Sequence, residues 1–311
     1  MSLKKHPDFT VEEIGVQTVD VYDIEVDNNH NFFGNGILVH NSCFIILDDL
    51  IDRVKPDNPI DFIDKIMKDV FEPLFETSYD DLAERMGAMS NRMVLEREKI
   101  ATGIFQEPKR YILNIYDNEG VRYENPKLKV TGVEAVRSSI PAVFRKGLKE
   151  CFSLMLETND ESLVVKRLNE LKESYKTMDL RKISSPMSAN NLEKYADSST
   201  IYTPRTPINV RAALLYNHLI EQKGLDNKYR LIGSGDKILF VHLIMPNPIH
   251  ENVIGFLDFF PEEFGLNNYI DRDTQIQKSF IAPLDRMFTT IGWSSLIPAK
   301  GANDCQLDLF F

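Results

Sequence analysis

The spacing of the apolar residues constrains the fold of this chain more than any other feature, because that spacing changes along the sequence. Between Phe9 and Val26, apolar and polar residues alternate in short stretches, which is typical of β-strands. From Phe62 to Phe75, pairs of apolar residues recur every four positions, which places them on one face of an α-helix. This change of period predicts an α+β fold, with a small all-β segment first and mostly helices later.

Turn signals divide the β-rich start. Residues 27–30 are predicted to form one turn, and residues 32–36, which contain Asn35-Gly36, a second. Residues 37–39 and 44–47 are predicted strands on either side of Asn41-Ser42.

The remaining elements follow from the same patterns. A helix is expected from Asn58, with Pro73 bending or ending it, and another is expected after Ser139 as its cap and Pro141 at its start. A hairpin is expected around a four-residue turn at 117–120. Further strands are predicted over 93–98 and 237–244, and further helices over 168–175, 207–219 and 276–288.

Composition limits the functional classes. The 311 residues are 43% hydrophobic, enough for a sizeable core and about two domains. The net charge of −11 argues weakly against a nucleic-acid binder, although a local basic face can act within an acidic protein. Cys43, Cys151 and Cys305 fit neither a disulfide framework nor a zinc cluster, and no signal peptide or apolar run of about 18 residues is present. We therefore expect a protein of a reducing compartment that does not contact membranes.

His40-Asn41-Ser42 carries a possible self-cleavage chemistry. An Asn side-chain amide can attack its own backbone carbonyl, which forms a succinimide and cuts the next peptide bond, and the Ser42 hydroxyl can accept an acyl chain. An imidazole can protonate the departing amine, which suits His40, and a second imidazole, that of His30, can assist the attacking amide. For the tripeptide alone, a simple turn is the commoner interpretation.

The surrounding sequence resembles the last two conserved blocks of inteins. The resemblance rests on residues 22–26, 30–32, 35–36 and 37–42, in the expected order and spacing. It implies a β-rich horseshoe fold over residues 1–41 and protein splicing without a cofactor, with Asp23 as the acidic residue that tunes both cleavage steps. Because Met1 opens directly on this segment, we expect a split intein that acts in trans with an N-terminal partner carrying the N-intein. An artificial fusion is the alternative.

The residues after Ser42 resemble the family B DNA polymerases of large tailed phages. Residues 42–47 are similar to the strand after the catalytic Asp-Thr-Asp carboxylates, and Lys109-Arg110-Tyr111 match the primer–template motif of the palm, with Pro108 where that motif often has Lys. Further landmarks lie at 95–98, 126–134, 137–139, 188–191, 194–195, 208–211, 215–217 and 280–284. The resemblance covers essentially all of 42–311 and implies a DNA-directed DNA polymerase.

Phosphoryl transfer to a primer 3′ hydroxyl requires two divalent ions about 4 Å apart, held by carboxylates. The resemblance implies two Mg²⁺ ions and deoxynucleotide substrates in the ligated enzyme. It places the main aspartate ligands on the N-terminal partner, so we expect no metal ligand in this chain. Glu98 resembles a third palm carboxylate, for which an ion pair with Arg97 or Lys99 is the alternative. Asp48 and Asp49 are adjacent carboxylates, but capping of the next segment is their more common role.

The densest basic stretch of the chain suits contact with a duplex backbone, which basic side chains can bind without reading sequence. The resemblance implies that primer–template DNA is bound by Lys109, Arg110, Tyr111, Lys127, Lys129, Arg137 and Ser138, with Asn190 and Lys194 as additional thumb contacts. Arg145, Lys146 and Lys149 continue the stretch. A solvated charged face is the usual alternative.

The last residues resemble a sliding-clamp motif of the Gln-Leu-Asp-Leu-Phe type. An apolar peptide at a chain end is an aggregation hazard unless it fills a pocket. The motif residues are Gln306, Leu307, Leu309, Phe310 and Phe311. Packing against the thumb is the alternative.

These expectations give four parts: an intein segment (1–41), part of the palm (42–129), a mostly helical thumb (130–298) and a clamp-binding tail (299–311). The expected partners are the N-terminal polymerase fragment, primer–template DNA, deoxynucleotides and a sliding clamp, in the cytoplasm of a phage-infected bacterial cell. Two alternatives stay open: a non-catalytic DNA- and clamp-binding accessory protein released by intein self-cleavage, and a maturation module whose only activity is self-cleavage.

Overall fold

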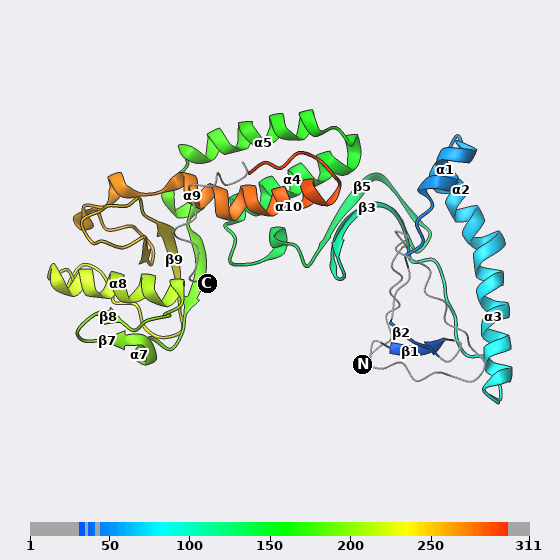
Figure 1. The fold of residues 1–311 in the computed structure, drawn as a ribbon, viewed down its shortest axis with the longest axis horizontal. Helices are drawn as coiled ribbons and strands as arrows, with labels where there is room; N and C mark the ends of the chain where they lie inside the picture. Colours follow the sequence, from blue (N-terminus) through cyan, green and yellow to red (C-terminus); the bar gives the residue numbers. More distant parts are fainter. Residues whose placement is uncertain (1–30, 35–36, 41–43, 298–311) are drawn as a thin grey trace, which may run out of the picture. The chain divides into compact units, whose positions relative to one another are not determined.

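A computed structural model describes residues 31–34, 37–40 and 44–297 of the protein (Figure 1). The chain divides into two compact units, residues 1–100 and residues 101–311. Helices and β-strands both occur widely among the described residues, so the mixed fold predicted from the sequence is confirmed. No helix in the described part of the chain is long and apolar enough to cross a membrane.

The first unit contains a short hairpin of β1 (Asn31–Gly34) and β2 (Ile37–His40). The antiparallel register leaves only two residues between the strands. The strand predicted over 37–39 is therefore confirmed. The turn predicted over 32–36 is too long, because Phe32 and Phe33 belong to β1, and a two-residue connection suits the twist of a hairpin.

Two predicted strands are wrong. Residues 44–47 form no strand and lead into α1 (Asp48–Val54), and residues 93–98 form no strand before β3 (Lys99–Glu107). Exposure does alternate from residue to residue along 91–98, as the apolar pattern predicted. A β-strand also needs a neighbouring strand for its backbone hydrogen bonds, and no described strand pairs with either segment.

Asn58 starts a long helical segment, as predicted. Its side-chain oxygen accepts hydrogen bonds from the amides of Ile60 (3.1 Å) and Asp61 (3.3 Å), which caps α2 (Pro59–Ile66). The segment continues through a π-helical turn, η1 (Met67–Phe71), into α3 (Glu72–Arg85). Pro73, the second residue of α3, does not end the helix, because the wider π turn before it accommodates a residue without an N–H group.

The second unit contains a three-stranded antiparallel sheet in the order β3–β4–β5, with β4 at Arg110–Asn118 and β5 at Val121–Thr131. β4 and β5 form the predicted hairpin, but its turn is two residues long instead of four. Glu119 and Gly120 connect the strands with φ angles of 53° and 83°, the signs of a type I′ turn. The Asp117 carboxylate accepts a hydrogen bond from the Gly120 amide (2.9 Å), which closes the turn.

One hydrophobic core forms between this sheet and the helices that follow it. It is made by α4 (Ala142–Thr158), α5 (Glu161–Lys176) and a C-terminal segment of α9 (Arg272–Ile276), η5 (Gln277–Ile281) and α10 (Ala282–Thr290). Tyr175 lies at its centre, with ring centroids 4.8 Å from Phe144 and 5.2 Å from Phe280.

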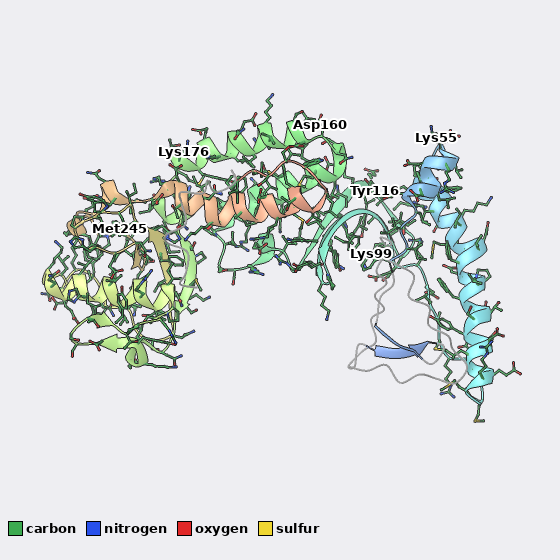
Figure 2. All side chains as sticks on the ribbon, in the orientation of Figure 1. Lys55, Lys99, Tyr116, Asp160, Lys176 and Met245 are labelled. Atoms are coloured by element: carbon green, nitrogen blue, oxygen red, sulfur yellow. The ribbon has the colours of Figure 1, made fainter. Side chains whose placement is uncertain are left out.

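The caps of these helices differ from each other. Asp160 caps α5 by accepting hydrogen bonds from the amides of Ser162 and Leu163 (Figure 2). The predicted cap of α4 is wrong: Pro141 occupies the N-cap position, Ser139 lies outside it, and no side chain caps this helix. Proline suits this place because its ring fixes the backbone angle φ and it has no N–H group to satisfy.

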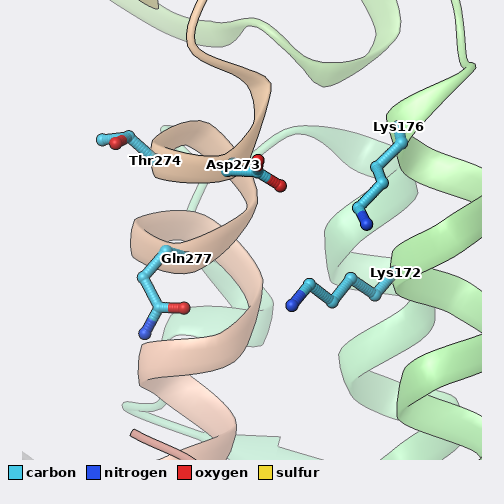
Figure 3. A pocket seen from close by; sticks show the side chains of 5 residues that line it. All are labelled: Lys172, Lys176, Asp273, Thr274 and Gln277. Atoms are coloured by element: carbon cyan, nitrogen blue, oxygen red, sulfur yellow. The ribbon is translucent and has the colours of Figure 1, made fainter. Parts of the chain in front are cut away.

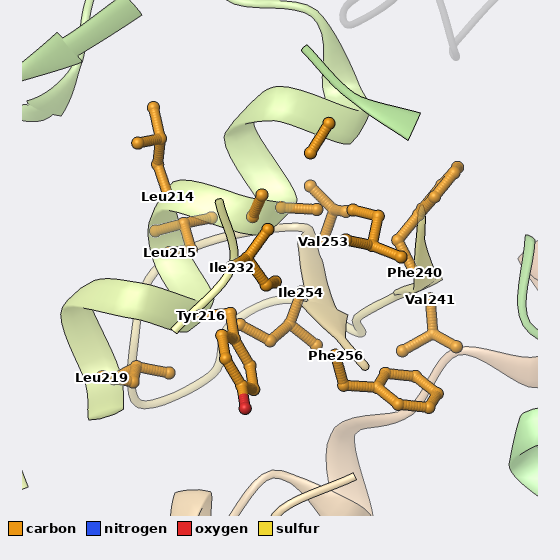
Figure 4. Packing of buried hydrophobic residues seen from close by; sticks show 14 of the residues in the cluster. Leu214, Leu215, Tyr216, Leu219, Ile232, Phe240, Val241, Val253, Ile254 and Phe256 are labelled. Carbon is orange, nitrogen blue, oxygen red and sulfur yellow. The ribbon is translucent and has the colours of Figure 1, made fainter. Parts of the chain in front are cut away.

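A second core lies under a sheet in the order β10–β9–β6, formed by β6 (Ser185–Ala189), β9 (Asp236–His242) and β10 (Val253–Phe256). Helix α8 (Ile208–Gln222) covers it, and Figure 4 shows its buried side chains beside those of β10. Gly255 permits the close approach, because a Cβ there would lie 2.8 Å from the Ala212 carbonyl oxygen. The helix predicted after Pro207 and the strand predicted near 237–244 are confirmed.

The remaining described elements are short. They are η2 (Glu134–Val136), α6 (Leu180–Ile183), α7 (Leu192–Tyr195), β7 (Ala196–Asp197), β8 (Ile201–Tyr202), η3 (Glu262–Phe264) and η4 (Asn267–Tyr269).

Candidate nucleic-acid interface

The pleat of the β4–β5 hairpin sorts the basic residues onto two faces. Lys129 lies opposite Leu113, and Lys127 lies opposite Ile115. Cross-strand partners share a face, so both lysines lie on the face that carries the odd-numbered residues of β4, including Tyr111. Arg110 and Ile112 lie on the other face, which packs against the first core of the second unit.

The two lysines reach solvent beside buried neighbours, because Leu113 and Ile115, which share their face, are buried. Lys127 and Lys129 are exposed, and the Lys127 ammonium lies 3.8 Å from the centroid of the Tyr123 ring, a cation–π contact that restricts the side chain. The Tyr111 ring is half-buried beside Phe105, with ring centroids 5.4 Å apart. This edge strand therefore presents two ammonium groups in line along one face of the sheet.

Lys109 lies at the other end of the hairpin, in the turn between β3 and β4. Its φ angle is 63°, in the left-handed region, and its side chain is exposed. The Lys109 carbonyl packs against Gly132, where a Cβ would collide with it. Gly132 itself has a φ angle of 64°, so this contact needs glycine for both its space and its backbone angle.

Arg110 enters an ion cluster around the buried carboxylate of Glu134. The Glu134 Oε1 atom lies 2.9 Å from Arg110 Nη2 and 2.9 Å from Arg286 Nη2. The Arg137 guanidinium is farther away, at 3.8 Å, and is exposed, as is Ser138 next to it. Arg110 also reaches Glu107 at 3.3 Å. The structure therefore brings β4, η2 and α10 together at one carboxylate.

Opposing effects set the protonation of Glu134. Burial penalises the charged form and on its own would raise the pKa. The backbone hydrogen bond and the guanidinium groups of Arg286, Arg110 and Arg137 favour the carboxylate and outweigh burial, so the pKa of Glu134 is below its ordinary value.

The basic residues of α4 flank an open groove. Its floor contains Leu128 of β5 and Leu154, and its sides include Lys146 and Lys149. Arg167 of α5 also lines the groove, but its guanidinium is held by Glu150 at 2.8 Å and Glu170 at 3.0 Å. The two lysines are exposed and Arg145 is half-buried.

Asn190 and Lys194 lie on the surface of the segment that forms the second core and are not brought together with the hairpin. Asn190 follows β6, and Lys194 lies on α7 with its ammonium 5.2 Å from the Tyr195 ring centroid. Both side chains are exposed. The loop is held by a hydrogen bond from the Asn191 amide to the Ser234 hydroxyl (2.7 Å).

The acidic candidates lie in the first unit. Glu98 is exposed and forms an ion pair with Lys99, while Asp48 and Asp49 occupy the first turn of α1. Negative charge at a helix N-terminus is favourable, which accounts for this pair of aspartates. No group of three or more His, Cys, Asp or Glu residues in the described part of the chain could hold a metal ion.

Several predicted site residues lie outside the described residues. They are Asp23, His30, Asn41 and Ser42 of the splice site and Gln306, Leu307, Leu309, Phe310 and Phe311 of the tail. His40 is the last residue of β2, where its backbone pairs with Asn31.

An open pocket between α5 and α9 offers a contrast to the Glu134 cluster. Figure 3 shows Lys172 and Lys176 of α5 extending toward the helical segment that carries Asp273, Thr274 and Gln277. Lys176 is paired with Glu173 at 2.8 Å. This pocket therefore combines both signs of charge and has no buried ionic group among its described lining residues.

Sequence reasoning missed Arg286, and it treated Glu134 only as part of a motif. Arg286 lies on the C-terminal helix and is far from the basic stretch in sequence. No local spacing connects it to Glu134, so only the packing of α10 beside η2 brings the two together.

The chain is similar to two phage DNA polymerases. It is 30% identical over 266 residues to a DNA-directed DNA polymerase of Escherichia phage RB69, a match that covers 79% of this chain and 29% of that protein. It is 28% identical over 284 residues to the DNA-directed DNA polymerase of Enterobacteria phage T4, which covers 85% of this chain and 31% of that protein. The chain therefore spans less than a third of the length of these curated relatives. No protein-family model matches the chain.

The Glu134 cluster should stabilise the second unit in a pH-dependent way. Glu134→Gln leaves three guanidinium groups without their shared carboxylate, so we expect the free energy of unfolding at pH 7 to fall by on the order of 3 kcal/mol. Because the folded-state pKa of Glu134 is lowered, its contribution is present above the pKa of the unfolded state and is lost as pH falls. The difference between the two proteins, measured by urea unfolding, should therefore shrink below about pH 4.

Glu107→Gln is the matched control, because Glu107 also faces Arg110 but is 59% exposed. Its effect should stay within about 1 kcal/mol. Equal stability of Glu134→Gln and the unaltered protein, or a difference that does not depend on pH, would contradict this account.

Proposed function

We propose that this chain is the C-terminal part of a phage family B DNA-directed DNA polymerase, and that it acts after it joins an N-terminal fragment. The similarity to two phage polymerases over about four fifths of the chain carries this proposal. Because the chain spans less than a third of those proteins, nucleotide addition, the deoxynucleotide substrates and the cytoplasmic setting belong to the proposed joined enzyme.

Within that enzyme, residues 42–129 would contribute to the palm and residues 130–298 would form the thumb. The proposed palm–thumb junction falls within β5, close to Gly132 and Glu134. Lys127 and Lys129 would bind phosphates of the primer–template duplex through their exposed side chains. This role needs exposed cations without a carboxylate partner, and the structure gives both lysines exposure and, for Lys127, an aromatic support.

The two Mg²⁺ ions of such an enzyme would activate the primer hydroxyl and stabilise the leaving diphosphate. The described residues do not fit a metal site, since Glu98 is exposed and paired with Lys99. We propose that the metal ligands lie on the N-terminal fragment, as the resemblance implies, and that this chain holds the duplex.

The lysine face can be tested in the full chain. A Lys127→Gln/Lys129→Gln variant should bind a primed DNA duplex more weakly regardless of its sequence. If each lysine contacts one phosphate, the slope of log affinity against log salt concentration should shrink by roughly two. Fluorescence anisotropy over a series of salt concentrations measures this slope.

Lys172→Gln/Lys176→Gln removes two lysines from α5 and serves as the control with the same change in net charge. Equal slopes for the two double variants would mean that bulk charge, not the lysine face, accounts for binding.

We further propose that residues 1–41 act as a C-terminal split-intein segment. An acyl chain from the N-terminal partner would form an ester with the Ser42 hydroxyl. The Asn41 amide nitrogen would then attack the Asn41 carbonyl, which forms a succinimide and frees the Ser42 amine to attack the ester. His40, His30 and Asp23 would assist the proton transfers. The hairpin of β1 and β2, which contains His40 among its described residues, is consistent with the β-rich segment of this proposal.

Mixing this chain with its N-terminal partner should yield a ligated product without residues 1–41. Asn41→Ala should block excision, and Ser42→Ala should stop ligation while it still permits cleavage after Asn41. Mass spectrometry of the products separates these outcomes. A normal ligated product from Ser42→Ala would refute the mechanism, and release of residues 42–311 by cleavage after Asn41, without ligation in the unaltered chain, would favour the accessory-protein alternative.

The tail completes the proposal. We propose that Gln306, Leu307, Leu309, Phe310 and Phe311 bind a sliding clamp, as their motif suggests. Trp293 and Leu296, shortly before the tail, are held to α10: the Trp293 ring lies 4.9 Å from that of Phe288, and the Leu296 amide donates to Asp285 (2.7 Å).

Deleting residues 306–311 from the ligated enzyme should leave nucleotide addition without a clamp nearly unchanged. With the clamp loaded, we expect shorter products, because loss of an apolar anchor costs about 2 kcal/mol, or roughly thirtyfold in affinity. Product length on a long primed template is the measurement. Unchanged processivity, or a melting temperature lowered by truncation, would favour packing of the tail against the thumb.

A further inference from the structure

The ion cluster at Glu134 has more positive than negative charge. Arg110, Arg137 and Arg286 surround one carboxylate. Within the described residues, the only other acid in the ion pairs of these three arginines is Glu107, at 3.3 Å from Arg110. Arg110 thus has a carboxylate on either side. Arg137 and Arg286 have only the Glu134 carboxylate as a described ion-pair partner, and they share it with Arg110. The part of the cluster formed by Arg137 and Arg286 therefore carries more positive than negative charge.

These two guanidinium groups are also the accessible part of the cluster. The side chain of Arg137 is 55% exposed and that of Arg286 is 43% exposed, whereas the Glu134 side chain is 11% exposed. The neighbouring acid, Asp285, is engaged elsewhere, since its Oδ1 atom accepts hydrogen bonds from the Ser295 hydroxyl (2.9 Å) and the Leu296 amide (2.7 Å). Among the described ion pairs, Arg286 is joined to Glu134 and not to Asp285, although the Asp285 carboxylate keeps its own charge.

We propose that Arg137 and Arg286, positioned by Glu134, form a joint binding site for one phosphodiester group of a nucleic-acid backbone. This inference rests on the proposed function and adds Arg286 and Glu134 to the residues that serve it. A guanidinium group has five N–H donors in a planar fork, so each arginine retains donors beyond those used on Glu134. The carboxylate contributes by fixing two long side chains near each other before the phosphate arrives, which reduces the entropy lost on binding.

Arg167, in the same unit, is an arginine whose charge is fully compensated by carboxylates. Its side chain is 43% exposed, the same as that of Arg286, but two carboxylates, Glu150 and Glu170, hold it at 2.8 Å and 3.0 Å. One cation between two anions has no surplus charge to offer a phosphate. Arg167→Ala is therefore the matched control for Arg286→Ala.

The test measures DNA affinity against salt concentration for the full 311-residue chain with a primed duplex oligonucleotide. Arg286→Ala and Arg137→Ala should each weaken binding by about tenfold at 0.1 M salt, as expected for loss of a charge-assisted hydrogen bond. Because both arginines bind the same phosphate, Arg137→Ala/Arg286→Ala should reduce the log–log slope by about one, not two. Arg167→Ala should leave the slope unchanged.

Two further variants distinguish the effect of charge from that of geometry. Arg286→Lys keeps the positive charge but lacks the planar guanidinium group. It should therefore show the same slope of log affinity against log salt concentration as the unaltered chain, but only part of its affinity. Glu134→Gln should weaken DNA binding although it makes the chain more positive, a result that a purely electrostatic effect cannot produce. Circular dichroism and thermal unfolding identify any variant that is not folded, and the Arg286→Lys comparison remains decisive if Glu134→Gln is unstable.

The outcomes distinguish this inference from the proposed function. If the unaltered chain binds DNA and the arginine variants bind equally well, the site is refuted while the proposed function stands; a slope reduced by two would refute the sharing of one phosphate. A second experiment uses inorganic phosphate in place of DNA and measures its binding as a rise in the melting temperature of the chain. If the chain binds no DNA but phosphate stabilises it and not Arg137→Ala/Arg286→Ala, the ligand is a free phosphate and the nucleic-acid assignment is wrong. If neither ligand binds, both proposals fail.

Discussion

The buried carboxylate of Glu134 links three segments of the second unit that are far apart in sequence. A carboxylate taken out of water is costly unless cations compensate it, and here the compensation comes from β4, from the residue after η2 and from α10. Apolar packing between the sheet and α4 brings these elements together but does not fix their direction. The 2.9 Å contacts to Arg110 and Arg286 supply that direction, because charge-assisted hydrogen bonds depend on geometry. The orientation of the hairpin on the helices therefore depends on this ion cluster.

The same hairpin divides one basic stretch into structural and exposed cations. Arg110 faces the core and is needed by Glu134, so its removal would damage the fold as well as any contact with a ligand. Lys127 and Lys129 lie on the opposite face and do not take part in the ion cluster of Glu134. Because the basic residues of this stretch are close in sequence, they suggested a single basic surface. The side chains of a β-strand alternate between the two faces of the sheet, so the structure places these residues on two surfaces. A variant of Lys127 or Lys129 consequently reports on binding more cleanly than a variant of Arg110.

The sequence predicted elements whose causes are local. Asn58 caps its helix through its own neighbours, and the apolar spacing after Pro207 and around Tyr175 predicted helices that form as expected. Some local details were also wrong, namely the Ser139 cap and the lengths of the two turns, but the predictions that lost a whole element failed because its cause is distant. Residues 44–47 and 93–98 have the composition of strands, but a strand exists only if another segment pairs with it, and the pattern of one segment cannot show this. The site behaves in the same way: the basic residues of the hairpin were found from their density, whereas Arg286 became part of the site only through tertiary packing.

The net charge of −11 would suggest an unfavourable surface for nucleic acid, yet the charge that a phosphate experiences is local. At 0.1 M salt, the screening length is about 10 Å, so exposed charges act mainly on their near neighbours. Around Arg167, two glutamates face one cation, whereas in the Glu134 cluster three arginines face two carboxylates, those of Glu134 and Glu107, although both clusters belong to the same unit. Total charge cannot distinguish these two places, but their carboxylate-to-guanidinium ratios can. The acidic composition therefore does not by itself exclude a phosphate at the Glu134 cluster, because the guanidinium groups there outnumber the carboxylates that pair with them.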